Sequence, residues 1–266
     1  MYDITVIITA YNAEKYLKES INSIIAQHFK KWKIIAVDDG SKDKTYEILK
    51  NFSNTLKDQI SIIKNDNNLG INISLNKALK QVSTPFFTRQ DADDISLSNR
   101  LEILINSLKN NPDYYFVSSK MQSISDKNLT YPLKLIPYPK KCEFIASLPF
   151  CNAPTLFKSE ILNKIKFNTS NLYKKRFEDY EFFFQCYVNN YFGYNITKIT
   201  YLVRQDLDYY RKIKTKQRVI EFFLKYRIYK EFKNNIKDAK YLLIAFIKIF
   251  IPSILVRIII KNIYKY

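Results

Sequence analysis

Short apolar runs rich in β-branched residues alternate along the first half of the chain with longer segments whose apolar residues recur at helical spacing. The short runs are typical of buried strands, and the longer segments are typical of helices that bury one face. Asn12 is the expected cap of the first helix. Strands alternating with helices predict a mostly parallel sheet with right-handed crossovers. The pattern predicts strands at 4–9, 33–37, 60–64 and 86–88, and helices at 13–27, from 45, from 71 and at 98–110.

The middle of the chain has a different pattern. Residues 131–149 include four prolines, which predict an irregular connection interrupted by a short helix at 142–147. A further helix, rich in aromatic residues, is expected at 178–189. These segments therefore stand outside the regular alternation of strand and helix.

Polar clusters follow three of the predicted strands: Thr9-Ala10-Tyr11, Asp38-Asp39-Gly40-Ser41 and Asp91-Ala92-Asp93-Asp94. The carboxyl ends of parallel strands meet at one edge of a sheet, and ligands bind beyond that edge. We therefore expect the three clusters to form one site.

The chemistry of these clusters suits a nucleotide and a metal. Tyr11 offers a face on which a base can stack, and Asp39 can accept the N3–H of a uracil. Asp91 can reach a ribose or a metal ion, and Asp93 a metal ion, so that the pair can hold a hard divalent cation against a diphosphate. Each acidic cluster also has a structural alternative. The acidic residues at 91–94 could cap the helix at 98–110, and residues 38–41 could form an ordinary turn with a helix cap.

Composition excludes several classes of protein. Glycine accounts for only three of the 266 residues, far below its usual share of about 7%. A P-loop and a G-x-G-x-x-G fingerprint are therefore excluded. His28 is the sole histidine and is expected on a helix face, which makes a serine–histidine hydrolase or a histidine-rich zinc site improbable. The three cysteines show no C-x-x-C spacing and predict free thiols in a reducing compartment.

Charge is concentrated near the end of the chain. The net charge is +18, and residues 201–266 hold 16 basic and 5 acidic residues. The stretch 242–260 is mostly apolar but is interrupted by Lys248, Pro252 and Arg257, so it is too broken for a spanning helix of about 20 apolar residues. Lysines beside apolar side chains predict a helix lying on an anionic membrane surface, and not a nucleic-acid-binding arm. The alternative is a terminal helix packed on the rest of the chain.

Several stretches together resemble the family 2 glycosyltransferases, whose nucleotide-binding fold is called GT-A. They are VIITAYNAEKYLKESINSIIAQ, VDDGSKDKT, NNLGINISLNKAL and TRQDADDIS, and more loosely Arg176 to Phe183, which is similar to the Glu-Asp motif of that family. The resemblance implies an α/β fold of GT-A type with a mostly parallel central sheet flanked by helices. It is weak beyond Tyr201, where the charge and apolar pattern predict a helical basic extension. It implies that Asp179 is the catalytic base with Glu178 beside it, that Asp93 and Asp91 hold Mn²⁺ or Mg²⁺, and that the UDP-sugar donor is bound by Thr9, Tyr11, Asp39, Asn68, Gly70, Arg89 and Asp91. The alternative for Asp179 is an ordinary acid at the start of an aromatic core helix.

Three departures from the motifs of the family affect these expectations. Asn152-Ala153 stand where the family often has a histidine, and residues 203–206 offer no late metal-binding histidine, which leaves the last metal ligand open. The Q-x-x-R-W motif of processive synthases is absent, which favours the addition of one sugar at a time.

The sequence thus predicts a GT-A domain at 1–205, with a donor-binding part at 1–105 and an acceptor-binding part at 106–205, and a basic extension at 206–266. The expected activity is inverting transfer from a UDP-sugar (GlcNAc, Gal or Glc) to a lipid-linked saccharide of a bacterial lipooligosaccharide, lipopolysaccharide or capsule, as in the β-1,3-N-acetylglucosaminyltransferases that the chain resembles. A sugar-phosphate nucleotidyltransferase and a catalytically silent saccharide- or membrane-binding subunit are the rival functions. No signal peptide is expected before the first strand, so the location expected is the cytoplasmic face of the inner membrane.

Overall fold

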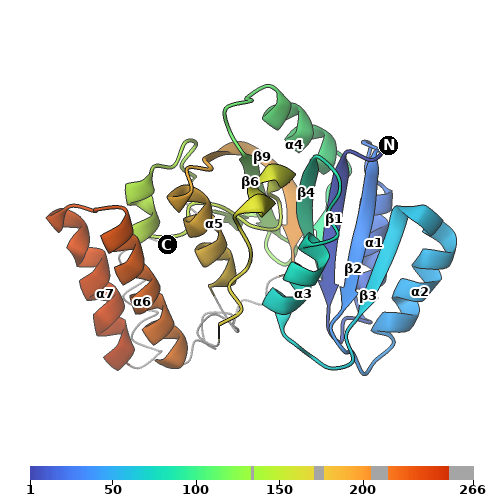
Figure 1. The fold of residues 1–266 in the computed structure, drawn as a ribbon, viewed down its shortest axis with the longest axis horizontal. Helices are drawn as coiled ribbons and strands as arrows, with labels where there is room; N and C mark the ends of the chain where they lie inside the picture. The colour runs from blue at the N-terminus through green and yellow to red at the C-terminus, as the bar shows by residue number, and fades with distance from the viewer. Residues whose placement is uncertain (133–134, 171–176, 205–214, 252–266) are drawn as a thin grey trace. The chain divides into compact units, whose positions relative to one another are not determined.

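The computed structural model describes residues 1–132, 135–170, 177–204 and 215–251, and the chain divides into two compact units (Figure 1). The first unit consists of residues 1–139 and 149–204. The second consists of residues 140–148 and 205–266. The short segment 140–148 therefore belongs with the C-terminal helices and not with the chain on either side of it.

The first half of the first unit alternates strands and helices as the sequence predicts. The strands β3, β2, β1 and β4 lie side by side in that order, and all three pairings are parallel. Apolar β-branched residues fill most of β1 and β2, whose residues are almost all buried, because both faces of the sheet are covered there. The strands are β1 (Ile4–Ala10), β2 (Trp32–Asp38), β3 (Ile60–Lys64) and β4 (Phe86–Asp91), and the helices are α1 (Leu17–Ile25), α2 (Thr45–Leu56) and α3 (Ile71–Leu79).

The second half extends the same sheet with mixed pairings. Beyond β4 the order is β8, β6, β9 and β5, with β7 on β6. β8 is antiparallel to β4, and β9 is parallel to β6. The further elements are β5 (Ile95–Ser96), α4 (Arg100–Lys109), β6 (Phe116–Ser123), β7 (Thr130–Tyr131), β8 (Leu156–Lys158), α5 (Glu178–Val188) and β9 (Gly193–Val203).

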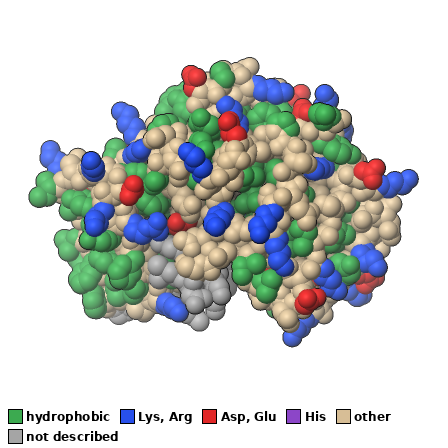
Figure 2. Space-filling model, in the orientation of Figure 1, with side chains coloured by type: hydrophobic (Ala, Val, Ile, Leu, Met, Phe, Trp, Pro, Cys, Tyr) green, Lys and Arg blue, Asp and Glu red, His purple; other side chains and the backbone are tan. Residues whose placement is uncertain are grey.

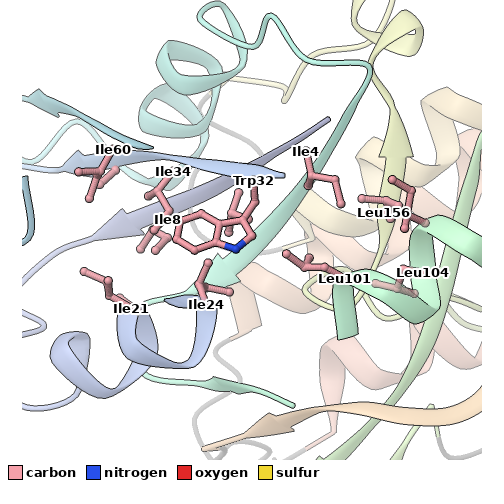
Figure 3. Packing of buried hydrophobic residues seen from close by; sticks show 14 of the residues in the cluster. Ile4, Ile8, Ile21, Ile24, Trp32, Ile34, Ile60, Leu101, Leu104 and Leu156 are labelled. Carbon is pink, nitrogen blue, oxygen red and sulfur yellow. The ribbon is translucent and has the colours of Figure 1, made fainter. Parts of the chain in front are cut away.

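One core cluster lies between the sheet and the helices α1 and α4 (Figure 3). Alternate residues of β1 point into it, because successive side chains of a strand face opposite ways. Ile21 and Ile24 come from α1, and Leu101 and Leu104 come from α4. The cluster fixes the parallel strands, and therefore fixes where their carboxyl ends lie.

Two local predictions are wrong. Helix α1 begins at Leu17 with Tyr16 at its N-cap and no side-chain cap, so Asn12 does not cap it. The Asn12 side-chain oxygen instead accepts the N–H of Lys42 at 2.9 Å, which joins the loops after β1 and β2. His28 lies beyond the end of α1, with its side chain 62% exposed, and is not a residue of a helix face.

The second unit is a pair of helices, α6 (Thr215–Glu231) and α7 (Ala239–Phe250), with the short 3₁₀ turn η2 (Lys141–Ile145). Phe144 of η2 meets the ring of Phe232 at 5.9 Å, and Lys225 Nζ donates to the Ala146 carbonyl at 3.0 Å. α7 packs on α6, and Pro252 and Arg257 of the expected tail lie outside the described residues. Among the helices described, none is both long and apolar enough to cross a bilayer.

Candidate functional site

Three strand ends meet at one edge of the sheet. Ala10 pairs with Asp38, and Thr9 pairs with Asp91, so the polar clusters that follow β1, β2 and β4 are neighbours in space. The Asp39 N–H donates to the Ala10 carbonyl at 2.8 Å, which holds the second cluster against the first. Tyr11 is 47% exposed at this edge, where its ring is open to a ligand.

Asp39 organises the loop that follows β3. Its Oδ1 accepts the Leu69 N–H at 2.9 Å and the Asn65 amide at 2.8 Å, and its Oδ2 accepts the Gly70 N–H at 2.9 Å. A carboxylate offers about four acceptor positions, so three donors leave room for one more. The sequence singled out Asp39, Asn68 and Gly70 but missed Asn65, for which the available cue was its position directly after β3.

Gly40 is required where these two loops touch. Its φ is +73°, and a Cβ there would stand 2.4 Å from the backbone carbon of Asn67. The loop carrying Asn68 and Gly70 therefore lies directly against the loop carrying Asp39. Asn68 is exposed on it, and Gly70 is the N-cap residue of α3, with a φ of +92°.

Arg89 joins the sheet edge to the first turn of α5. Its side chain is 7% exposed, its Nη2 lies 3.1 Å from Asp91 Oδ1, and its Nη1 lies 2.7 Å from Asp179 Oδ1. Burial lowers the pKa of Arg89, but Asp179 and Asp91 raise it by more, so that the guanidinium stays charged. The sequence placed Arg89 among the donor-binding residues, whereas here its guanidinium is bound to two carboxylates.

Asn152 is a neighbour of Asp179 that the sequence did not place in the site. Its side-chain amide donates to Asp179 Oδ1 in a short hydrogen bond. Its own oxygen is buried and accepts no hydrogen bond from the described residues. The available cue was its position, since Asn152 stands where the resembling family often has a histidine.

Burial and like charges govern the carboxyls at the start of α5. Burial raises the pKa of Asp179, and Arg89 opposes that effect. Burial and the neighbouring Asp179 raise the pKa of Glu178 to about 7. The helix N-terminus, which favours an ionised carboxylate, is thus outweighed by loss of contact with water.

The acidic loop after β4 does not cap the following helix. α4 begins at Arg100 with Asn99 at its N-cap and no side-chain cap. Asp94 Oδ1 instead accepts the Arg204 N–H at 2.7 Å, and the Arg204 side chain donates to the Asp93 carbonyl at 2.9 Å. The capping alternative for this loop is therefore excluded. Residues 38–41 likewise do not cap α2, whose N-cap is Lys44.

Asp91 and Asp93 fit a hard divalent cation in part. Burial and the charge of Asp91 raise the pKa of Asp93, so two like charges are held where a cation would relieve their repulsion. Oxygen donors are what Mg²⁺ and Mn²⁺ take. Over the described ranges, no three His, Cys, Asp or Glu side chains are grouped as a metal site. The carboxylates fit as a partial ligand set that a diphosphate and water would complete.

Arg100 fixes the end of β4 through buried hydrogen bonds. Its guanidinium is fully buried and donates to the Thr88 hydroxyl at 2.6 Å, the Arg89 carbonyl at 2.7 Å and the Gln90 side-chain oxygen at 3.0 Å. Burial lowers the pKa of Arg100 to about 10, which leaves it charged at neutral pH. The residues flanking Asp91 therefore have little freedom to move.

The sheet with its acidic edge is a fold of the GT-A type. It is shared by S. aureus TarS 1–349 in complex with UDP, at a TM-score of 0.69 and 22% identity over 90% of this chain and 69% of that one. It is also shared by a mannosyltransferase from Pyrobaculum calidifontis in complex with GDP-Man and Mn²⁺, at a TM-score of 0.67 and 18% identity over 95% and 72%. The expected fold class is thereby confirmed.

The chain belongs to Glycosyl transferase family 2, whose model matches residues 5–182. An uncharacterized glycosyltransferase of Methanocaldococcus jannaschii, MJ1057, is 32% identical over 97% of this chain and 92% of its own. A shorter match, 34% identical over 43% of this chain and 45% of the other, is to the Escherichia coli UDP-Glc:alpha-D-GlcNAc-diphosphoundecaprenol beta-1,3-glucosyltransferase WfgD. The protein is thus a glycosyltransferase, and the alternative hypothesis of a sugar-phosphate nucleotidyltransferase is wrong.

Proposed function

We propose that this glycosyltransferase moves one sugar from a UDP-sugar to a hydroxyl of a saccharide acceptor, with inversion at the anomeric carbon. The observation that carries the proposal is the bridge made by Arg89, which binds Asp91 at the sheet edge and Asp179 at the start of α5. It holds a carboxylate suited to act as a base beside the place where a diphosphate would lie. This contact supports a catalytic role for Asp179 over that of an ordinary acid at the start of an aromatic helix.

The donor is expected to bind along the sheet edge. The exposed ring of Tyr11 suits a stacked uracil, and the remaining acceptor position of Asp39 suits the N3–H of that base. Thr9 and Asp91 lie side by side where the ribose and diphosphate would follow, with Asn68 and Gly70 on the loop that borders the site. A structural relative of known UDP complex supports uridine, and GlcNAc, Gal and Glc are the donor sugars we propose.

A divalent ion, Mn²⁺ or Mg²⁺, would be held by Asp93 and Asp91 and would neutralise the departing diphosphate. A structural relative that is described with Mn²⁺ supports this choice. Asp91 Oδ1 now contacts Arg89. If that oxygen bound the ion instead, Asp91 would lose its contact with Arg89, and Arg89 would keep its contact with Asp179.

Asp179 acts as the general base in this scheme. The acceptor hydroxyl gives its proton to Asp179 while its oxygen attacks the anomeric carbon from the face opposite the diphosphate. The bond from that carbon to the phosphate oxygen breaks, and UDP leaves with the electron pair. Arg89 and Asn152 both occupy Oδ1 of Asp179, which leaves Oδ2 to take the proton. Glu178 beside it would orient the acceptor or its loop.

We further propose that the acceptor is a lipid-linked saccharide of a bacterial lipooligosaccharide, lipopolysaccharide or capsule, extended by one sugar at the cytoplasmic side of the membrane. The name of the E. coli relative, which acts on a diphosphoundecaprenol-linked sugar, supports a lipid-linked acceptor. A β-1,3-N-acetylglucosaminyl linkage remains the specific expectation.

Release of UDP from a panel of UDP-sugars tests the proposed activity. We expect slow, Mn²⁺-dependent hydrolysis of one donor, loss of release in EDTA, and an inactive Asp93→Ala variant. A saccharide-binding subunit without catalysis would release no UDP from any donor. Full activity of Asp93→Ala in EDTA would remove the metal from the scheme.

A further inference from the structure

Helix α7 carries an apolar stripe on its exposed side. Leu243, Phe246, Ile247 and Phe250 recur at the i, i+3, i+4 and i+7 positions of one helix face. All four are exposed, with Leu243 at 59% and Phe250 at 72%, and Figure 2 shows hydrophobic side chains gathered over α7 and α6. A helix that is apolar on its exposed side as well requires a second apolar environment.

The packing of α7 on α6 uses contacts outside most of this stripe. Ala245 is buried in the helix pair, and Lys248 Nζ is bound to Glu221 of α6 at 3.2 Å. The ring of Phe246 touches Phe222 of α6 at one edge of the stripe. The stripe therefore meets α6 through the ring of Phe246, on which Phe250 packs at 5.2 Å, and its outer side is an additional surface.

Lysines border the stripe. Between residues 215 and 251 there are nine basic and three acidic residues, and Lys230, Lys233, Lys237 and Lys240 are exposed where α6 passes into α7. One of the acids, Glu221, is neutralised by Lys225 at 3.6 Å and Lys248 at 3.2 Å. The other two acids, Glu231 and Asp238, lie among these four lysines, so that this end of the stripe keeps a net positive charge.

We propose that this stripe, with the lysines at its end, binds the surface of an anionic lipid bilayer. Apolar side chains enter the boundary between headgroups and acyl chains, and lysines beside them meet the lipid phosphates. A nucleic acid would leave the stripe uncovered, and a second copy would bring the same positive charge to the contact. The proposal concerns the second unit alone and does not depend on the transfer reaction proposed above.

Flotation of the full chain with vesicles tests the proposal. The wild type should float with vesicles containing phosphatidylglycerol, and the pair Leu243→Ser and Phe250→Ser should lower the partition coefficient by about tenfold or more. The pair Leu243→Ile and Phe250→Leu keeps the apolar area and should bind as the wild type does. Lys237→Gln with Lys240→Gln should weaken binding by about tenfold, and on anionic vesicles only. The matched control is Lys50→Gln with Lys80→Gln, which changes two exposed lysines of the first unit and should leave binding unchanged.

Two results would overturn the proposal. One is unchanged flotation of the serine pair when its melting curve matches that of the wild type. The other is a wild type that sediments as a dimer and does not bind vesicles, together with a serine pair that sediments as a monomer. That result would make the stripe a self-association surface. UDP release by the serine pair, measured without membranes, reports separately on the proposed activity.

Discussion

At the scale of single residues, Arg89 and Asn152 fix the orientation of the Asp179 carboxylate. Both donate to Oδ1 of this carboxylate, whose side chain is 33% exposed. Charged and amide donors to one oxygen hold the group in place and favour its ionised form. We therefore propose a positioning role for the two donors, with the other oxygen, Oδ2, taking the proton in the proposed reaction.

Asn152→Ala should lower kcat by about 10- to 100-fold while leaving the affinity for UDP unchanged, since a lost positioning bond is paid in transition-state alignment. Asn152→Asp should cost more, because a second carboxylate beside Asp179 repels it. Single-turnover transfer and UDP calorimetry measure the two effects. Asn111→Ala is the matched control, because Asn111 also donates an amide bond, to Tyr194, away from the site. Equal losses of kcat in Asn152→Ala and Asn111→Ala would refute the positioning role.

Glu178 should make the stability of the protein depend on pH. Its pKa is about 7 in the folded chain against an ordinary 4.5, so the folded state binds more protons between these values. The free energy of unfolding should therefore fall as pH rises from 4.5 to 7. Glu178→Gln should remove this slope and stabilise the protein at pH 8 by about 1–2 kcal/mol. Urea unfolding at pH 5 and pH 8 measures this, and a parallel pH slope in the variant would exclude Glu178 as its source.

At the scale of elements, the loop between β3 and α3 is held by one carboxylate. Asp39 accepts the N–H groups of Leu69 and Gly70 and the amide of Asn65, whose oxygen accepts from Lys77 at 2.6 Å. The loop that borders the proposed donor site thus depends on a residue that we propose also contacts the donor. We therefore expect donor binding and local order to be coupled at this point.

Asp39→Asn should weaken UDP binding and also lower the free energy of unfolding, each by about 1–3 kcal/mol, since an amide cannot accept at both of its ends. Calorimetry and urea unfolding read the two losses separately. Asn65→Ala is the comparison, because it loosens the loop and leaves the carboxylate in place. If Asn65→Ala weakens UDP binding as much as Asp39→Asn, Asp39 acts only through the loop and does not contact the base.

Local pattern predicted the parallel strands but not how every helix begins. The first strands are continuous apolar runs, and such a run is enough to predict a buried strand from the sequence. Asn12 has the chemistry of a helix cap, but its hydrogen bonds to Ser41 and Lys42 use its backbone and side chain for a tertiary contact instead. Asp91 and Asp39 could be placed because each is an acid at the carboxyl end of a strand. Asn65 also follows a strand directly, but its uncharged amide did not single it out, and Asn152 meets Asp179 only through a contact distant in the chain.

At the scale of the whole molecule, the two halves of the sheet differ in what the sequence reveals. β1 to β4 pair in parallel through crossovers that repeat one local motif. β8, β6, β9 and β5 pair with segments far away in the chain, as when Ser96 meets Tyr201. Residues 140–148 pack with α6 and were expected to belong to the domain before it. Local pattern carries no record of such pairings.

The central claim, that Asp179 is the base of a sugar transfer, is tested most directly by Asp179→Asn in a single turnover with the active UDP-sugar and Mn²⁺. The variant keeps the size of the side chain and can still accept from Arg89, but it cannot take the proton. We expect transfer to fall by about 10²- to 10⁴-fold, the range for removing one general base, with UDP affinity unchanged. Transfer by Asp179→Asn at the wild-type rate would show that another group is the base and would contradict the account.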